Sequence, residues 1–373
     1  MNFTVSSTTL SSCLQALSRV LNSKSALPIL DSFLFDVADN KLTITASDGE
    51  NVITTSVDLI DSNESFSFCL YSKTIIDAVK EFAEEPLSFD INTMEMSATI
   101  KYHNGQNRIP VQAADAYPRI QMNDGPMTEI KVAANSLEKA ITRSLFATTQ
   151  DELRPVMNGL YFDLKSDSLT IVASDGHKLV RNENREVKGN EPASFILPKK
   201  PSTLLKSLLP KDGDVSIKFN AATAVLEFGT TKLTCRLIEG RYPNYNSVIP
   251  QNNPNELTID RQALLGALRR VLVFASQSSY LICFRLENNK LTLSSEDIDF
   301  SKSANEELTC EYFGQQMSIG FKGTTLIEVL NNIDSQEVVF KLADPSRAGV
   351  VVPATQNENE DLLMLFMPMM LND

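Results

Sequence analysis

The stretch "LTIVASDGHKLV" at residues 169–180 has two relatives elsewhere in the chain. One is "LTITASDG" at residues 42–49, and the other is the weaker "LTLSSEDI" at residues 291–298. Their starts, at positions 42, 169 and 291, lie about a third of the 373-residue chain apart. Similar stretches at a regular spacing indicate internal repeats. The sequence therefore predicts three copies of one structural unit.

The residues around each stretch repeat as well. An alternating apolar run comes before each one: "FLFDV" from residue 33, "LYFDL" from residue 160 and "CFRLE" from residue 283. Alternation with a period of two is typical of a half-buried strand. A polar pair follows each run, and such pairs favour tight hairpin turns. The pairs are Asp39-Asn40, Asp167-Ser168 and Asn288-Asn289. We expect an antiparallel hairpin in every unit.

Helical periodicity of the apolar residues occurs twice in every unit. The six segments are 9–21, 71–80, 135–147, 198–209, 260–274 and 320–333. Asn135 and Asp260 are expected N-caps, because their side chains can accept hydrogen bonds from the first helical turn. Further strands follow the second helix, so each unit is expected to run helix, strands, helix, strands.

These elements predict an α+β fold built from three tandem domains. Hairpin loops this short require mainly antiparallel sheets, since parallel strands need long crossovers. Turn-rich polar segments mark the boundaries, "NDGPM" near residue 125 and "IPQNNPNE" near residue 250. We therefore expect domains over residues 1–125, 126–250 and 251–373.

Composition limits the possible classes of protein. The apolar fraction is 42% and the net charge is −13, which disfavours a generic nucleic-acid binder unless positive charge is concentrated on one face. The five scattered cysteines are expected to be reduced, with neither a metal site nor a cofactor site. The start of the chain has no signal-peptide pattern, and "LLMLFMPMML" at 362–371 is too short to span a bilayer. We expect a cytoplasmic protein.

Charge is distributed unevenly between the predicted helices and the rest of the chain. The six helical segments hold twelve Lys or Arg and four Asp or Glu, a net +8, which leaves −21 elsewhere. Exposed helix faces can collect Lys and Arg without any function. Positive helices repeated in three units instead favour a surface that attracts the phosphate backbone without distinguishing bases.

The whole chain resembles the bacterial DNA polymerase III beta subunits, the replicative sliding clamps. The resemblance rests on "LPIL" (27–30), "NGLYF" (158–162), "ASDGHKLV" (173–180), "EGRYPNY" (239–245) and "MPMML" (367–371). It implies a ring-forming, head-to-tail homodimer with sheets outside and helices lining a hole around double-stranded DNA. A separate ATP-dependent clamp loader would open the ring. The function implied is that of a DNA polymerase processivity factor, a non-catalytic subunit of the holoenzyme.

Three sets of site residues follow. The cations expected to face DNA are Arg19, Lys24, Lys73, Lys80, Lys139, Arg143, Lys199, Lys200, Lys206, Arg269, Arg270 and Lys322. By family position, the dimer seam would contain Ile109, Val111, Val273 and Phe274, although ordinary core packing is an alternative for each. The pocket for partner peptides would contain Met157, Ser174, Gly176, His177, Lys178, Leu179, Pro243, Ser247, Val248, Arg347, Gly349, Leu365, Met367, Pro368, Met369 and Leu371.

The resemblance implies that the replicative polymerase subunit, the clamp loader and repair polymerases dock in this pocket through short apolar-tipped linear motifs. Four methionines between residues 364 and 370 suit a surface that accepts several partners. Ser247 stands where many clamps have Arg, and Met370 where some have a basic residue. The preferred motif is therefore expected to be shifted, with a less basic pocket.

Two other functions remain open. The first is an enzyme that uses Asp175 and His177, but the same turn occurs with Glu50 in place of the histidine. His103 is the only other histidine, and neither a nucleophile elbow nor a metal-ligand pair is present. The second is a structural repeat protein without a role on DNA, which would show no charge asymmetry.

Overall fold

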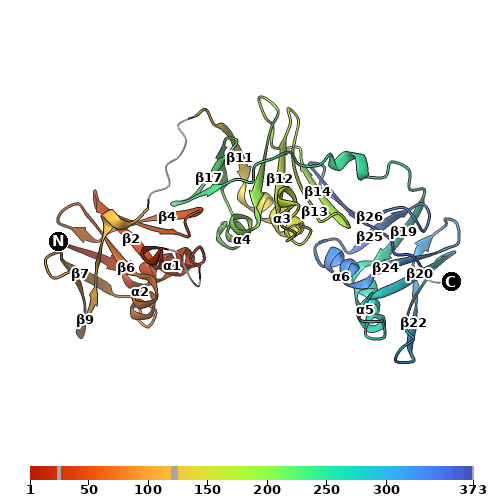
Figure 1. Ribbon diagram of the computed structural model, residues 1–373, viewed down its shortest axis with the longest axis horizontal. Helices are drawn as coiled ribbons and strands as arrows, with labels where there is room; N and C mark the ends of the chain where they lie inside the picture. Colours follow the sequence, from red (N-terminus) through yellow and green to blue (C-terminus); the bar gives the residue numbers. More distant parts are fainter. Residues whose placement is uncertain (23–26, 119–124, 372–373) are drawn as a thin grey trace. The chain divides into compact units, whose positions relative to one another are not determined.

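The computed structural model describes residues 1–22, 27–118 and 125–371 (Figure 1). The chain divides into two compact parts, which we call unit 1 and unit 2. Unit 1 comprises Met1–Leu137 and Thr203–Leu237, and unit 2 comprises Glu138–Ser202 and Ile238–Asp373. The second sequence repeat therefore contributes to both units, because its strands join sheets that begin in the first repeat and end in the third.

Unit 1 contains two antiparallel sheets. The five-stranded sheet has the order β5 (Asp61–Ser62), β1 (Asn2–Ser6), β7 (Pro86–Asn92), β8 (Ser97–Tyr102) and β9 (Gly105–Pro110). The nine-stranded sheet has the order β10 (Gln112–Ala113), β6 (Phe66–Tyr71), β2 (Ser32–Ala38), β3 (Lys41–Ser47), β4 (Asn51–Asp58), β18 (Thr231–Arg236), β17 (Thr223–Phe228), β16 (Asp214–Phe219) and β11 (Thr128–Ala133). Pairing of β4 with β18 joins the first repeat to the second.

Unit 2 also contains two antiparallel sheets. The nine-stranded sheet has the order β15 (Ala193–Pro198), β12 (Gly159–Leu164), β13 (Leu169–Ser174), β14 (Lys178–Asn184), β27 (Glu360–Phe366), β26 (Gly349–Pro353), β25 (Glu337–Leu342), β19 (Asn255–Asp260) and β23 (Glu311–Tyr312). The four-stranded sheet has the order β22 (Lys302–Thr309), β21 (Lys290–Asp297), β20 (Leu281–Glu287) and β24 (Met317–Lys322). Pairing of β14 with β27 joins the second repeat to the third. The expected α+β class with antiparallel sheets is confirmed.

Each α-helix in the described residues begins immediately after a strand. The helices are α1 (Ser7–Ser18), α2 (Ser72–Val79), α3 (Ala134–Leu145), α4 (Lys199–Leu208), α5 (Arg261–Leu272) and α6 (Gly323–Asn331). Short 3₁₀ turns lie at Pro28–Asp31, Ala114–Ala116, Pro155–Met157 and Tyr245–Val248. All six helices lie within three residues of the predicted bounds. The strand before the first helix of each repeat (β1, β11 and β19) was not predicted. None of the described helices is both long enough and apolar enough to cross a membrane.

The two expected N-caps had different outcomes. The Asp260 carboxylate accepts a hydrogen bond from the Ala263 N–H at 2.8 Å, so this prediction is confirmed. The prediction for Asn135 is wrong, since α3 already begins at Ala134. The Ala134 N–H donates to the carbonyl of Gly213 at 2.8 Å, which fixes the start of α3 from a segment that the local pattern does not include.

The polar pairs do form hairpin turns. Asp39 and Asn40 both have positive φ angles, 50° and 59°, between β2 and β3. This conformation matches the twist of the two flanking strands. Asn289 has a φ of 58° between β20 and β21. The corresponding turn of the second repeat lies between β12 and β13, which pair in register from Tyr161 to Leu164.

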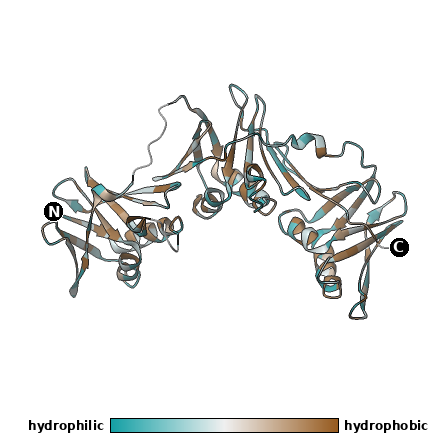
Figure 2. Cartoon of the chain, viewed as in Figure 1, coloured by the Kyte–Doolittle hydropathy of each residue, from teal (hydrophilic) through white to brown (hydrophobic). Residues whose placement is uncertain are grey.

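Buried phenylalanines form much of the core of each unit. In unit 1, Phe3 stacks on Phe89 with ring centroids 4.7 Å apart, and Phe35 stacks on Phe68. In unit 2, the Phe321 ring lies edge-on to both Phe284 and Phe366, at 5.3 and 5.0 Å. Figure 2 shows the hydrophobic residues along the strands and helices, with hydrophilic residues toward the loops. Helix α1 packs on α2 in unit 1, and α5 packs on α6 in unit 2 (Figure 1).

Candidate functional site

The turn at residues 174–178 connects β13 to β14 through a set of local hydrogen bonds. The Asp175 carboxylate accepts from the backbone N–H groups of His177 and Lys178 at 2.8 and 2.9 Å. The Gly176 N–H donates to the Ser174 hydroxyl at 3.1 Å, and Gly176 has a φ of +92°. Glycine adopts such an angle without steric cost. Asp175 is therefore occupied by the backbone of the turn.

The first repeat builds the same turn without a histidine. The Asp48 carboxylate accepts from the backbone N–H groups of Glu50 and Asn51 at 2.9 and 2.7 Å, and Gly49 has a φ of +96°. The two turns have the same hydrogen bonds, although Glu50 follows the glycine in one and His177 follows it in the other. The aspartate therefore has a structural role in both turns. The aspartate caps the turn in both repeats, and in the second repeat it bonds the backbone of His177.

A pocket lies beside this turn in unit 2. Its volume is about 370 Å³. Three segments line it, from the turn, from the junction of β24 and α6, and from the end of the chain. The lining residues are Asp175, His177, Lys178, Phe321, Lys322, Thr325, Leu326, Phe366, Met367, Pro368 and Met369. Most of these side chains are apolar, so the pocket can hold the apolar side chains of a ligand.

The end of the chain, residues 367–371, forms one wall of the pocket, and we call it the tail. The Met367 N–H donates to the His177 carbonyl at 2.9 Å, and the Met369 N–H donates to the Gly320 carbonyl at 2.8 Å. A Cβ at Gly320 would lie 2.6 Å from the Met369 carbonyl oxygen, so only glycine allows the tail to approach β24 this closely. The tail thus connects the turn of the second repeat to the sheet of the third.

Lys178 connects the same two repeats through its charge. Its ammonium lies 3.4 Å from the Asp175 carboxylate and 2.9 Å from the Glu328 carboxylate on α6. It also lies 5.5 Å from the centre of the Phe146 ring, within the range of a cation–π contact. Asp175 and Lys178 therefore pair with each other, and Glu328 adds a second carboxylate to the same ammonium.

The remaining expected pocket residues fall into two groups. Met157, Leu179 and Leu365 are buried, and the last two belong to an apolar cluster with Tyr242 and Val350. Pro243, Ser247, Val248 and Arg347 are exposed, and Leu371 is partly exposed. Gly349 is buried, and a Cβ there would lie 2.9 Å from the Phe366 ring. The buried residues pack beneath the surface, and the exposed residues are available to a ligand.

Sequence reasoning missed several residues of this site. Arg154 donates to the Asp175 carbonyl at 3.1 Å and to the Asp151 carboxylate at 2.9 Å, so it helps to hold the turn in place. Phe321, Leu326 and Phe366 line the pocket but have no motif of their own. The alternation in β24 and β27 could have indicated that the phenylalanines are buried, but not that they meet.

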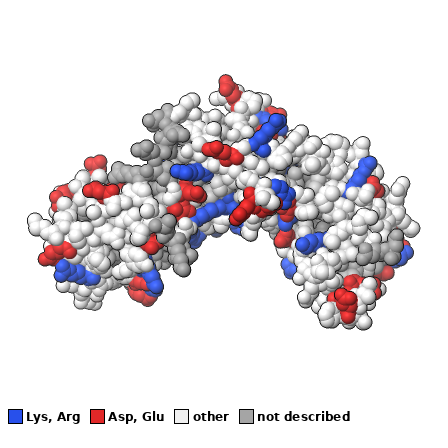
Figure 3. Space-filling view, viewed as in Figure 1, with Lys and Arg blue, Asp and Glu red and all other residues white. Residues whose placement is uncertain are grey.

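Within the described residues, the cations expected to face DNA lie on or next to the helices, and several already have partners. Arg143, only 15% exposed, pairs with Asp334 at 3.0 Å and Glu360 at 3.5 Å. Arg270 pairs with Glu306, and this hydrogen bond lowers the pKa of the Glu306 carboxyl. On the face shown in Figure 3, Lys and Arg often adjoin Asp and Glu.

Three other members of this set also have partners within the chain. Lys80 pairs with Asp77 at 2.8 Å, Arg19 donates to the Ser207 carbonyl, and Arg269 donates to the Asn331 side chain. Lys322 lines the pocket beside the turn. Lys24 lies outside the described residues. The set also contains Lys73 on α2, Lys139 on α3, and Lys199, Lys200 and Lys206 on α4.

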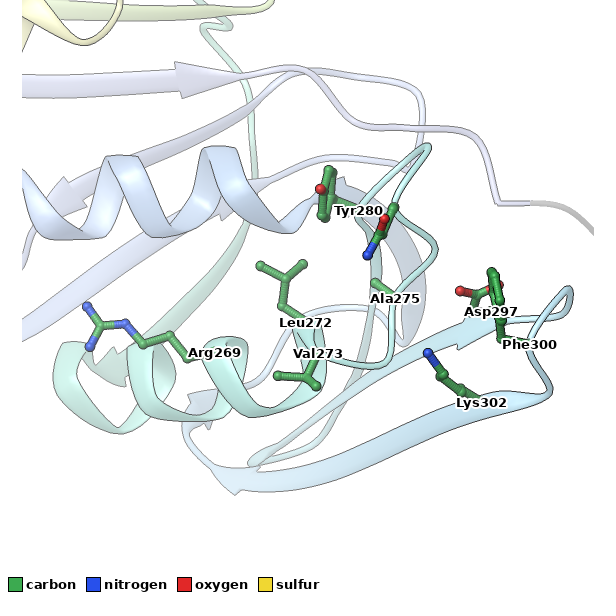
Figure 4. A pocket seen from close by; sticks show the side chains of 9 residues that line it. Arg269, Leu272, Val273, Ala275, Tyr280, Asp297, Phe300 and Lys302 are labelled. Atoms are coloured by element: carbon green, nitrogen blue, oxygen red, sulfur yellow. The ribbon is translucent and has the colours of Figure 1, made fainter.

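The residues expected at the dimer seam differ in exposure. Ile109 and Val111 are buried within the chain, at and after the end of β9. Val273 is 72% exposed just after α5, next to Phe274. A pocket of about 480 Å³ adjoins Val273, lined also by Arg269, Tyr280, Phe300 and Lys302 among others (Figure 4). Ile298 and Phe300, which were not expected at the seam, are 80% and 70% exposed.

Comparison with known proteins gives a consistent result along the whole chain. Three family models match in order: the N-terminal domain of the DNA polymerase III beta subunit at residues 1–121, its central domain at 131–244 and its C-terminal domain at 246–370. The beta sliding clamp of Pseudomonas aeruginosa is 27% identical over 373 residues, covering 100% of both chains. That of Caulobacter vibrioides is 26% identical, covering 94% of this chain and 96% of the relative.

Solved structures agree with these matches. A sliding clamp from Pseudomonas aeruginosa, crystallised with griselimycin, superposes with a TM-score of 0.94 at 26% identity, covering 100% of both chains. The DNA polymerase III beta subunit from Thermotoga maritima superposes with a TM-score of 0.90 at 25% identity, again covering 100% of both chains.

Proposed function

This chain belongs to the family of bacterial DNA polymerase III beta subunits, the sliding clamps, and we propose that it works as a homodimeric ring around duplex DNA. A sliding clamp is a processivity factor without a catalytic site of its own. One observation carries this function: three domain models of the same family match the chain in order, from residue 1 to residue 370.

Enclosure of DNA would make strong DNA affinity unnecessary. Phosphate contacts are independent of sequence, so a ring held by a few of them can slide along the duplex. Lys139 and Lys206 suit this role, because among the described residues no carboxylate lies within ion-pair distance of either ammonium. Arg143 and Arg270 suit it less well, because their charges are offset by neighbouring carboxylates.

Closure of the ring needs two identical seams, each between the first repeat of one protomer and the third repeat of the other. We assign the third-repeat side to an apolar patch made of Val273, Phe274, Ile298 and Phe300. Exposed apolar side chains that lie together are typical of interaction sites, and Val273 and Phe300 line the same pocket. The pocket beside Val273 can accept a side chain of the second protomer (Figure 4).

The sheets support the same assignment. Strand β9 is an edge of the five-stranded sheet of unit 1, and β22 is an edge of the four-stranded sheet of unit 2. Edge strands carry unpaired backbone groups and readily pair with another chain. Pairing of β9 with β22 of a second protomer would satisfy both edges. Ile109 lies on β9 with its side chain buried, so it would contribute backbone to this seam.

The pocket beside the turn would receive the partners. We assign to it the apolar-tipped linear motifs of the replicative polymerase subunit, the clamp loader and the repair polymerases. The apolar walls formed by Phe321, Leu326, Phe366 and the tail support this assignment. A clamp of this kind acts in the cytoplasm, on the replicating nucleoid.

Retention on DNA tests the function. The protein is loaded onto nicked circular DNA with a bacterial clamp loader and ATP, and then separated from unbound protein by gel filtration. We expect it to remain on the circle and to leave when a restriction enzyme linearises the DNA, because only topology holds it. A protein that stays equally long on linear DNA binds in another way and is not a sliding ring.

A parallel assay separates the clamp from the enzyme alternative. In a clamp, His177→Ala leaves retention on the circle unchanged and weakens only the binding of partner peptides. If Asp175 and His177 instead formed a catalytic pair, the same substitution would abolish a turnover activity of the purified protein. The hydrogen bond between the Asp175 carboxylate and the backbone of His177 favours the first outcome.

A further inference from the structure

The pocket beside the turn combines an apolar interior with a small number of charges. Its apolar side chains are Phe321, Leu326, Phe366, Met367, Pro368 and Met369. The Phe321 and Phe366 rings pack edge to face, 5.0 Å apart, and both are almost fully buried. This part of the wall is therefore rigid. A pocket with a rigid apolar wall gains its specificity from the few polar groups around it.

Two of these polar groups are already paired within the chain. The Asp175 carboxylate accepts two backbone hydrogen bonds and lies 3.4 Å from the Lys178 ammonium. The Lys178 ammonium lies 2.9 Å from the Glu328 carboxylate as well. A ligand that pairs with either side chain must compete with these bonds, so neither group is a strong recognition element.

Lys322 is the exception. It is exposed, and in the part of the chain that the structure describes no carboxylate lies within ion-pair distance of its ammonium. Its backbone is held firmly, since Lys322 pairs with Leu281 in the sheet and the next residue, Gly323, donates to the Tyr280 carbonyl at 2.8 Å. Because the backbone of Lys322 is fixed beside the pocket, its flexible side chain keeps the ammonium within reach of the pocket's border.

We propose that Lys322 makes this pocket select motifs that carry an acidic side chain next to their apolar tip. This inference rests on the proposed function, in which the pocket holds a partner peptide, and it adds the chemistry of the preferred partner. The apolar side chains of the motif fill the pocket, and the neighbouring carboxylate pairs with the Lys322 ammonium. Apolar walls lower the local dielectric constant, so a charge pair at their border is stronger than the same pair in open solvent.

The assignment also explains why a basic residue occurs at this position. Lys322 was expected to face DNA, but it lines the pocket together with His177 and Met369. Lys322 precedes the first residue of α6 and adds a positive charge to the border of the pocket, while Glu328, farther along α6, pairs with Lys178.

Fluorescence anisotropy with matched peptides tests the proposal on the full-length protein. The peptides are nine residues long, labelled at the N-terminus and amidated at the C-terminus, so that the terminal carboxylate is absent. Each contains a leucine and a phenylalanine as its apolar tip, with Glu or Gln placed in turn at every flanking position. The proteins are the wild type, Lys322→Met and the control Lys188→Met, an exposed lysine outside the pocket.

We expect one flanking position at which the Glu peptide binds the wild type about threefold to tenfold more tightly than the Gln peptide at low salt. Lys188→Met keeps this ratio, and Lys322→Met reduces it to about one. Raising the salt concentration narrows the ratio in the wild type, because a charge pair is screened.

Two results overturn the proposal in different ways. If the wild type binds the Glu and Gln peptides equally at every position, or if Lys322→Met retains the preference, the pocket accepts apolar motifs but Lys322 does not select acidic ones. If the wild type binds none of the apolar-tipped peptides, the proposed docking function of the pocket fails, and the inference fails with it. Equal thermal unfolding of the three proteins shows that folding is not the cause.

Discussion

Replacement of Phe300 by alanine tests the seam most directly. The side chain is 70% exposed in the single chain, so association can bury most of it. Full burial of a phenylalanine contributes about 1.5–3 kcal/mol, and the exposed part corresponds to roughly 1–2 kcal/mol. A head-to-tail dimer contains two identical seams, so each substitution acts twice and costs about 2–4 kcal/mol. Since 1.4 kcal/mol is a factor of ten, Phe300→Ala should weaken the dimer by roughly 30-fold to 700-fold.

Sedimentation velocity over a dilution series measures this change as the dissociation constant of the dimer. Phe313 provides a matched control, because it is 72% exposed but lies just after β23 in the nine-stranded sheet of unit 2, away from the apolar patch. Phe313→Ala should leave the dimer unchanged. If both variants dissociate at the same concentration, within a factor of about two, burial of Phe300 does not hold the ring together. A variant that loses thermal stability as a monomer would point to a role in folding instead.

Three further predictions concern single groups. Gly320→Ala places a Cβ 2.6 Å from the Met369 carbonyl oxygen, so we expect the tail to move. Peptide affinity should then fall at least about tenfold in anisotropy titrations, and an unchanged affinity would refute the role of the tail in peptide binding. Burial raises the pKa of the Cys69 and Cys235 thiols to about 12, so both should react with iodoacetamide at pH 8 far more slowly in the native protein than in urea, and equal rates by mass spectrometry would contradict this. Arg143→Met should lower the free energy of unfolding in urea by about 1–2 kcal/mol and leave the salt dependence of DNA binding unchanged. Lys139→Met should instead lower the slope of log K against log salt concentration by about one. The opposite pattern would assign Arg143 to DNA.

The sequence predicted the local structure well because local structure depends on neighbouring residues. Strand alternation, the helical period and the polar pairs gave the hairpins and all six helices within three residues of their bounds. The turn at Asp175 could be interpreted without coordinates, since the first repeat keeps the same turn around Asp48. The missed strands, such as β1, are short segments in which alternation ends after two apolar residues, Phe3 and Val5.

The candidate site was predicted in part. The resemblance placed His177, Lys178 and the tail together, and these residues do line one pocket. Lys322, which was expected to face DNA, also lines this pocket, and that placement could not be predicted because the sign of a side chain does not say which surface it occupies. The partners of Arg143 are 191 and 217 residues away along the chain, so no local pattern shows that its charge is offset.

The sequence by itself determined the repeated unit, its secondary structure and its family, because these follow from periodicity and turn chemistry over a few residues. Only the tertiary structure decided how repeats share sheets, as in the pairing of β14 with β27, and which charges remain available. Ion pairs such as Lys178 with Glu328 form between residues 150 positions apart. Their formation depends on distances in space, which the order of residues along the chain does not specify.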